Sequence, residues 1–407
     1  MTIPAYNIRM DGDKYNIICF SNQLWDFPNW TNKRHVMSRL SKRGHTILFV
    51  DPPITTGRVF YRQVRKGKWS LTRSFTGVKV EDGVKVFSPL NYLPFFNLLS
   101  KFHASRLKYI SKLLLSSKRK TILWVYHVEM PGLQNYINTV PHDLLVYDCV
   151  DNYEAFPKYD TEKKKLWVRG QEEYLAKKAD LIFATTPGLA EKLKKYNSKV
   201  FFTPNVGDYE RFHDAKKYKD NLPEDLKDIP RPRIGFSGSL DEYKFDAKLM
   251  RKIAEDHPNY SFVLIGQIAY KDRDADLNNI GLGGLKNIYF LGEKPFEEMP
   301  EYYAGFDAYI IPYQLNEYTV GGCFPVKFHE ALAVGIPTIV TDLPAYMPFK
   351  DVSYIARNYG EFSFYLKKAL EEDNDTKVKE RKEVAKQNNW DGKVDTLLGY
   401  IEEAFEK

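Results

Sequence analysis

Cysteine is scarce in this sequence. The 407 residues contain three cysteines, an odd number at wide spacing, so a disulfide framework is not expected. Cys19 and Cys149 lie in apolar, strand-like runs and are predicted to be reduced, buried thiols of a cytoplasmic protein. No cluster of histidine and cysteine has metal-ligand spacing, so we expect neither a metal site nor a cofactor.

Long hydrophobic runs are also missing. The most apolar stretch, residues 89–100, is short and contains two prolines, whereas a membrane-spanning helix needs roughly 18 apolar residues or more. The first 15 residues lack a basic segment followed by an apolar one, so no signal peptide is indicated. These absences predict a cytoplasmic location, with peripheral membrane contact left open.

Charge is distributed unevenly along the chain. The net charge of +7 divides into about +16 over residues 1–205 and about −9 over residues 206–407. The basic half is suited to an anionic membrane surface, a nucleic acid or an acidic glycan, or it is simply a soluble surface. Basic and aromatic side chains alternate in residues 58–73, and the pattern of residues 101–115 predicts a helix with lysines between its apolar positions. An ordinary packed insertion is the alternative. No nucleic-acid-binding signature is present, so a nucleic-acid partner is not expected.

The first half predicts a parallel sheet covered by helices. Buried-strand patterns alternate with helical ones, which is typical of a doubly wound α/β domain. The strands are expected near residues 15–20, 46–50, 121–126, 144–147, 180–184 and 200–203. Ligands bind such sheets at the carboxyl ends of the strands. His127, Asp148 and Asp151 each follow a predicted strand and are therefore candidate catalytic residues.

A second domain of the same kind is predicted after a polar segment. Residues 208–232 are rich in lysine, aspartate and proline, which is typical of a linker, and a new sheet begins at Arg233. We therefore expect an N-terminal domain over residues 1–207, a linker over 208–232 and a C-terminal domain over 233–390. A final helix over 391–407 is expected to cross back to the first domain.

Residues 310–341 carry the most specific pattern in the chain. They are predicted to form a strand, a loop with Gly321 and Gly322, a helix from about Val326 to Val334, and a new strand after Gly335. A helix N-terminus favours a phosphate, and Lys327 and Glu330 share one helix face. A cation beside the helix start suits a diphosphate, and a carboxylate one turn later suits sugar hydroxyls. An ordinary strand–helix–strand unit with solvated charges is the alternative.

The whole arrangement resembles the GT-B glycosyltransferases, specifically glycosyltransferase family 4 and its bacterial teichuronic-acid-type and capsule-type members. The resemblance covers most of the chain. In the first half it is carried by Arg34-His35, Phe49 to Pro53, Tyr147-Asp148, Asp151, Ala179-Asp180, Thr186 and Pro204-Asn205. In the second half it is carried by Gly235, Gly238, Asp246, Gly266, Leu291-Gly292, Pro312, Pro325, Lys327, Glu330 to Ala333, Gly335 and Pro337.

This resemblance implies two tandem Rossmann-like domains and an enzyme that transfers a sugar, usually with retention and without a metal, from a nucleoside diphosphate to a glycan or lipid-linked acceptor. UDP is the default donor nucleotide. Glu330 would hold the ribose, and the diphosphate would be held by Lys327, Lys244 and the amides of Gly321 and Gly322. His127 would lie beside the transferred sugar, and Asp148 or Asp151 would be the acceptor base. The strand-end glycines Gly238, Gly266 and Gly292 complete the implied donor site.

One position departs from the family pattern. The family has a glutamate eight residues before Glu330, and this sequence has Gly322 there. Glu317, which lies in the longer preceding loop, is the candidate substitute. The departure favours one alternative, a non-catalytic nucleotide-sugar or glycan-binding subunit. Two others stay open: a nucleic-acid-binding protein that uses the basic half, and another GT-B enzyme such as an epimerase or phosphorylase.

Overall fold

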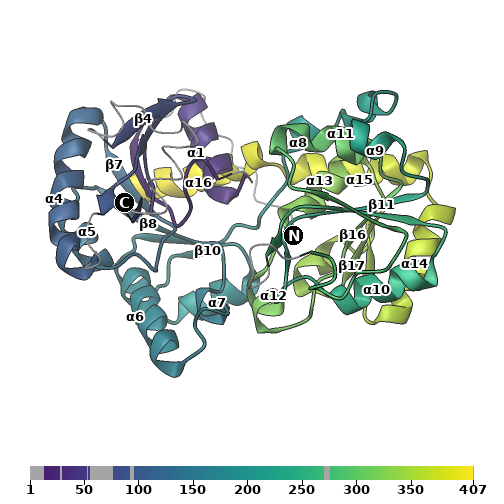
Figure 1. Cartoon of the computed structure of the whole chain (residues 1–407). Coiled ribbons are helices and arrows are strands. Elements are labelled where there is room, and N and C mark those ends of the chain that lie inside the picture. The colour runs from purple at the N-terminus through teal and green to yellow at the C-terminus, as the bar shows by residue number, and fades with distance from the viewer. Residues whose placement is uncertain are drawn as a thin grey trace. The chain divides into compact units, whose positions relative to one another are not determined.

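The chain divides into two compact units. The computed structural model describes residues 13–27, 30–52, 54–55, 77–91, 96–269 and 276–406. The N-terminal unit runs to Thr203 and takes in residues 394–407, and the C-terminal unit runs from Pro204 to Lys393. The last helix, α16 (Trp390–Glu406), has residues in both units. Figure 1 labels the elements of each unit.

The N-terminal unit is built on an eight-stranded sheet. Its strand order is β10-β9-β8-β7-β1-β2-β5-β4, and all neighbours are parallel except β4 and β5. The strands are β1 (Asn16–Phe20), β2 (Thr46–Val50), β4 (Val78–Glu81), β5 (Val84–Phe87), β7 (Thr121–Val125), β8 (Leu144–Cys149), β9 (Leu181–Ala184) and β10 (Val200–Phe202). A separate short pair joins β3 (Ile54–Thr55) and β6 (Leu90–Asn91). The order of the chain reverses between β1 and β7, which is where such sheets bind ligands.

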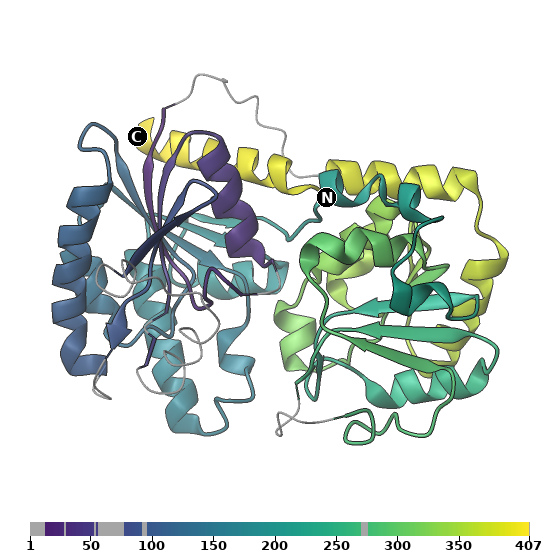
Figure 2. The same ribbon diagram turned by 45° about the horizontal axis from the view of Figure 1, so that its top comes forward.

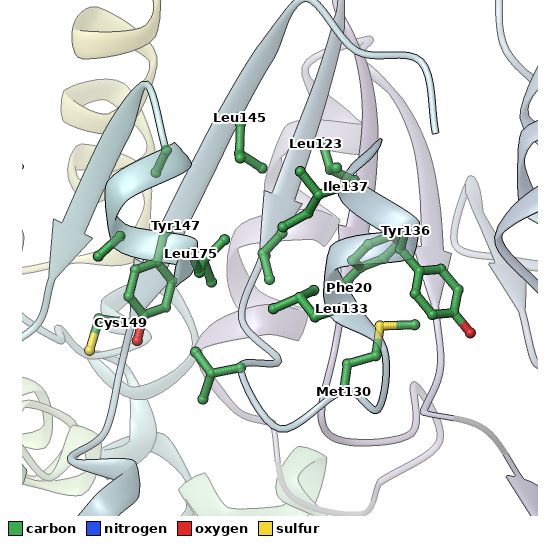
Figure 3. Packing of buried hydrophobic residues seen from close by; sticks show 14 of the residues in the cluster. Phe20, Leu123, Met130, Leu133, Tyr136, Ile137, Leu145, Tyr147, Cys149 and Leu175 are labelled. Atoms are coloured by element: carbon green, nitrogen blue, oxygen red, sulfur yellow. The ribbon is translucent and has the colours of Figure 1, made fainter. Parts of the chain in front are cut away.

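Helices cover this sheet on both faces. They are α1 (Asn32–Lys42), α4 (Phe96–Leu114), α5 (Leu133–Thr139), α6 (Glu162–Lys178), α7 (Pro187–Lys194) and the end of α16. One core cluster joins apolar side chains of α4, α5, α6 and α7 to the central strands. Figure 3 shows Leu133, Tyr136 and Ile137 of α5 packed beside Phe20 of β1 and Leu123 of β7. The alternation of strand and helix in the sequence predicted this layered core.

The C-terminal unit has a wholly parallel six-stranded sheet. Its order is β15-β13-β11-β16-β17-β18, so the chain reverses direction across the sheet between β11 and β16. The strands are β11 (Arg233–Ser237), β13 (Ser261–Ile265), β15 (Ile288–Gly292), β16 (Ala308–Ile311), β17 (Thr338–Thr341) and β18 (Tyr354–Ala356). A short pair, β12 (Leu240–Asp241) with β14 (Ile268–Ala269), extends beyond the ends of β11 and β13. This is the doubly wound order of dinucleotide-binding domains.

Helices lie on both faces of the second sheet as well (Figure 2). They are α10 (Ala247–Asp256), α11 (Met299–Ala304), α12 (Glu317–Gly322), α13 (Val326–Val334), α14 (Tyr359–Glu371) and α15 (Asp375–Gln387). Helix α13 packs against α15 on one side of the sheet, and α10 packs against α14 on the other. Two doubly wound domains were predicted from the sequence, and the structure confirms this fold class.

The segment expected to be a linker is instead folded onto the C-terminal unit. Residues 208–232 form α8 (Tyr209–Phe212), a 3-10 turn η2 (Ala215–Tyr218) and α9 (Glu224–Lys227). Phe212 is fully buried, with ring centroids 5.9 Å from Phe296 and 5.1 Å from Tyr303. The polar composition concealed four buried apolar positions, Phe212, Ala215, Leu226 and Ile229, which anchor the segment.

Part of the basic sequence lies outside the described residues. This applies to residues 56–76, which contain most of the alternating basic and aromatic side chains. Within the described ranges, none of the helices combines the length and apolar character needed to span a bilayer.

We predict that Phe212→Ala destabilises the C-terminal unit. Removing a fully buried phenylalanine leaves a cavity, and the expected loss in the free energy of unfolding is about 3 kcal/mol or more. Urea unfolding followed by tryptophan fluorescence measures it. Lys217→Ala, an exposed change in the same segment, is the control and should alter stability by less than about 0.5 kcal/mol. Equal stability of the two variants would contradict the packed role of this segment.

Candidate functional site

The start of helix α13 lies at the point where the C-terminal sheet reverses its strand order. The helix begins at Val326 after Pro325, which is the N-cap residue and has no side-chain cap. It ends at Gly335, whose φ of 88° is the left-handed conformation that closes helices. These bounds agree with the prediction from the sequence. The N–H of Phe328 donates to the carbonyl oxygen of Pro325 at 3.2 Å, and no side chain caps the first turn.

The ammonium group of Lys327 lies deep in this site. Its Nζ is 4.8 Å from the centroid of the Phe236 ring and 5.6 Å from that of Tyr313. Burial, followed by the charge of Lys244, lowers the pKa of Lys327 to about 8. An anion that binds near Lys327 would stabilise its charged form, because the negative charge offsets both the burial and the repulsion from Lys244.

Two glycines make room for this arrangement. Gly238, with φ of 137°, follows β11, and a Cβ at this position would lie 1.8 Å from Nζ of Lys327. Gly266, with φ of 140°, follows β13, and a Cβ there would lie 2.0 Å from the carbonyl oxygen of Gly238. Both positions need glycine for conformation and for space. Gly292, at the end of β15, also has a positive φ but has open space beside it.

Lys244 provides the second cation of the site. Its Nζ lies 3.1 Å from a carboxylate oxygen of Asp241. Burial acts to lower the pKa of Lys244, but Tyr313 and Asp241 outweigh it and the net shift is upward. The lysine therefore stays charged, and its charge acts on Lys327. The charge of Lys244 acts on Lys327, so the two lysines that the family resemblance assigned to the diphosphate are electrostatically coupled.

Glu330 is buried one turn further along α13. Burial, followed by the charge of Asp208, raises the pKa of Glu330 to about 8, while Lys327 and Arg211 oppose the rise. Asp208 is itself paired with Arg211 at 3.3 Å. Glu330 is therefore mostly protonated at neutral pH in the absence of a ligand. The simple alternative of solvated charges on an ordinary helix does not describe Lys327 or Glu330.

Three donor-site expectations need correction or remain unsupported. Gly321 and Gly322 were expected in a loop, but they are the last residues of α12, which begins with a capping box between Asn316 and Thr319. The N–H groups in the last turn of a helix already bond within that helix, so these amides are not presented to a phosphate. Glu317 is exposed at the start of α12 and forms no ion pair within the described ranges.

The N-terminal unit has its own polar group at the β1–β7 reversal. His127 follows β7 and is buried, and burial, then Lys158 and Lys33, lowers its pKa to about 3. Lys33, in the first turn of α1, is buried with its Nζ 5.5 Å from the centroid of the Tyr126 ring. Burial lowers the pKa of Lys33, and Asp151 is the first of the charges that oppose this. His127, Asp151 and Lys33 therefore form one electrostatic group.

Asp148 does not belong to the accessible part of this group. Strand β8 was expected to end before it, but the strand continues to Cys149, and Asp148 is fully buried. One carboxylate oxygen accepts a hydrogen bond from Nε1 of Trp124 at 3.2 Å. This position is unsuited to a base that must reach an acceptor. The cysteines Cys19 and Cys149 are free and buried, as predicted.

Sequence reasoning missed two residues of these sites. Lys33 could have been suspected from its position. It lies in the first turn of the helix that follows the first strand, and such helices begin at the ligand-binding edge of the sheet. Asp241 gave no signal, because it stands in a run of charged residues with no pattern. No group of three possible metal ligands occurs among the residues that the structure describes.

Comparisons with known proteins agree with this architecture. Residues 231–353 match the family described as glycosyl transferases group 1. The chain is 25% identical over 283 residues, or 66% of its length, to the putative teichuronic acid biosynthesis glycosyltransferase TuaH of Bacillus subtilis, of which 70% is covered.

Solved structures show the same fold over nearly the whole chain. The sucrose-phosphate synthase of Thermosynechococcus elongatus superposes with a TM-score of 0.69 at 14% identity, covering 97% of this chain and 100% of that one. HepE of Anabaena, solved in complex with UDP and glucose, gives 0.66 at 13% identity, covering 95% and 99%.

The fold, together with the glycosyltransferase match over residues 231–353, identifies a GT-B glycosyltransferase. Among such enzymes, this chain is similar to TuaH. The resemblance first found in the residues is thus confirmed at the level of fold and enzyme class.

We predict that Lys244→Met raises the pKa of Lys327. The change removes a neighbouring positive charge and frees Asp241, and both effects favour the ammonium form, so the pKa should rise above its value of about 8. NMR titration of ¹³C-labelled lysine side chains measures it. Lys248→Met, an exposed change of the same type nearby, is the control. An unchanged pKa in Lys244→Met would show that the two lysines are not coupled.

Proposed function

We propose that the C-terminal unit binds a nucleoside-diphosphate sugar at the start of α13 and that the enzyme transfers the sugar to a glycan or lipid-linked acceptor in polysaccharide synthesis. The observation that carries this proposal is the pairing of Lys327 with Lys244 beside an uncapped helix N-terminus. Two cations and the positive end of a helix dipole form a strong site for a diphosphate. The family match and the teichuronic acid relative support the polysaccharide context.

The same groups would assist the chemistry. When the bond between sugar and diphosphate breaks, negative charge accumulates on the leaving phosphate. Lys327, Lys244 and the helix dipole are placed to stabilise this charge without a metal ion. We therefore propose a metal-independent transfer, and retention of the anomeric configuration follows from the family resemblance.

Glu330 is proposed to hold the ribose hydroxyls. The carboxyl group of Glu330 can form hydrogen bonds with hydroxyl groups in either protonation state. A bound ribose would therefore provide hydrogen-bond partners that the apolar surroundings of Glu330 do not. UDP is the proposed nucleotide. The support for UDP is that HepE, which shares the fold, was solved with UDP, with UDP-glucose, and with UDP and glucose.

The N-terminal unit is proposed to receive the acceptor. His127 is neutral at physiological pH, so its ring can donate one hydrogen bond and accept another, which suits a sugar hydroxyl. Asp151, beside Lys33, is the proposed acceptor base. The free cysteines fit a reducing compartment, and we propose a cytoplasmic enzyme that works at an anionic membrane surface through its basic N-terminal half.

The first test is a thermal-shift comparison of UDP, GDP, ADP and CMP. A nucleotide present at about a hundred times its dissociation constant should stabilise the fold by about 2.7 kcal/mol. UDP is expected to give the largest shift. Lys327→Met should weaken UDP binding by roughly ten- to a hundredfold, because it removes a charged hydrogen-bonding partner. Glu330→Gln should weaken it by up to about tenfold, because it alters the hydrogen bonds to the ribose hydroxyls. Lys248→Met is the control. The absence of a response to any nucleotide would reject the proposed donor site.

Nucleotide binding should also depend on pH. The diphosphate favours protonated Lys327, whose pKa in the free protein is about 8, so UDP affinity should be constant below this pH and fall by up to about tenfold per pH unit above it. Titration calorimetry in a Glu330→Gln background removes the second group with a pKa near 8. Adding Lys327→Met to that background should abolish the pH dependence. Persistence of the fall without Lys327 would assign it to another group.

A further inference from the structure

Helix α4 in the N-terminal unit has two different sides. Its inward side belongs to the core of the unit, where Ala104, Leu107 and Ile110 are buried against the sheet and α5. The outward side faces solvent over several turns. The helix therefore needs only one of its faces to hold its place in the fold.

The outward side carries a row of large apolar side chains. Phe102, Tyr109 and Leu113 are 64%, 64% and 65% exposed. They are spaced by seven and four residues, so they lie along one line of the helix. Leaving three such side chains in water is unfavourable, and an aligned group of this kind is typical of a surface that meets an apolar partner.

A row of lysines runs beside the apolar row. Lys101, Lys108 and Lys112 each precede one of these side chains, so they repeat the same spacing about 100° around the helix. All three are exposed, and none is paired with a carboxylate in the described part of the chain. Helix α4 contains no aspartate or glutamate.

We propose that the outward face of α4 docks on an anionic lipid bilayer. An apolar row flanked by lysines fits a helix lying in the plane of a membrane, with apolar side chains among the acyl chains and ammonium groups at the phosphates. This inference rests on the proposed function for the role of the docking, which would bring the enzyme to a lipid-linked acceptor or to a growing polymer at the membrane.

A second surface in the same layer of helices has similar chemistry. Helix α6, which covers the same face of the sheet as α4, exposes 58% of Leu166 and 44% of Trp167 beside the exposed Lys163, while the neighbouring Lys164 is paired with Asp160 at 2.7 Å. Tryptophan favours the boundary between headgroups and acyl chains. The apolar component also separates a bilayer from a soluble polyanion, which would use the lysines alone.

The test is sedimentation of the full chain with phosphatidylcholine vesicles, with and without phosphatidylglycerol. Binding is expected only with phosphatidylglycerol and should fall steeply at high salt. The triple variant Lys101→Gln/Lys108→Gln/Lys112→Gln should bind on the order of a hundredfold more weakly. Phe102→Ser/Tyr109→Ser/Leu113→Ser should lose roughly tenfold or more. The matched control is Lys178→Gln/Lys195→Gln/Lys199→Gln, which removes three exposed lysines of the same unit and should bind as the wild type does.

Several results would overturn the proposal. These are an absence of vesicle binding, equal binding to neutral vesicles, or equal effects of the α4 and control lysine variants. Loss of binding in the lysine variant but not in the apolar variant would indicate purely electrostatic attraction and reject the docking of the apolar row among the acyl chains. UDP binding by thermal shift, measured on the same variants, keeps this test separate from the donor site. Vesicle binding without UDP binding would reject the proposed function alone.

Discussion

The close approach of the Lys327 ammonium group to the backbone of Gly238 is the constraint on which the C-terminal site depends. A Cβ at Gly238 would collide with Nζ, and a Cβ at Gly266 would collide with Gly238, so the ends of β11 and β13 are glycine for one shared reason. The buried amine then lies beside Lys244 in an unfavourable electrostatic setting that lowers its pKa. Such a setting is costly without a ligand and favourable once an anion is bound, which is how binding sites commonly differ from structural ion pairs.

The N-terminal unit uses the same physical device at its own strand reversal. Lys33 is buried at the start of α1. Burial lowers its pKa, and the negative charge of Asp151 is the main effect that raises it again. The lysine in turn helps to keep His127 neutral, after burial and Lys158. Each unit thus keeps at least one desolvated amine at the carboxyl end of its sheet. The two units differ in the charges near the amine. Carboxylates, led by Asp151, favour the charge of Lys33, whereas Lys244 disfavours the charge of Lys327.

The sequence predicted the layers and the main helix of the site because these depend on local patterns. Helix α13 has the expected bounds, since Pro325 and Gly335 punctuate it and apolar residues repeat between them. Errors arose where tertiary contacts override composition. Phe212 anchors a polar segment that resembled a linker, and Asn316 starts a helix that takes in Gly321 and Gly322. Asp148 is enclosed because β8 continues by two residues, a length that the hydrophobic pattern does not specify.

The absence of the family's first glutamate has a physical consequence at the donor site. With Gly322 at that position and Glu317 exposed at the far end of α12, Glu330 and Asp241 are the acidic groups that act on Lys327 in this structure. Fewer nearby carboxylates leave the two lysines less neutralised than a site with an additional glutamate would be. The electrostatic attraction for a diphosphate is correspondingly stronger, while one hydrogen-bond acceptor for a donor sugar is lost. Under the proposed function, the substitution would shift recognition from the sugar toward the diphosphate and ribose, and would leave in place Lys327 and Lys244, the groups proposed to stabilise the leaving phosphate.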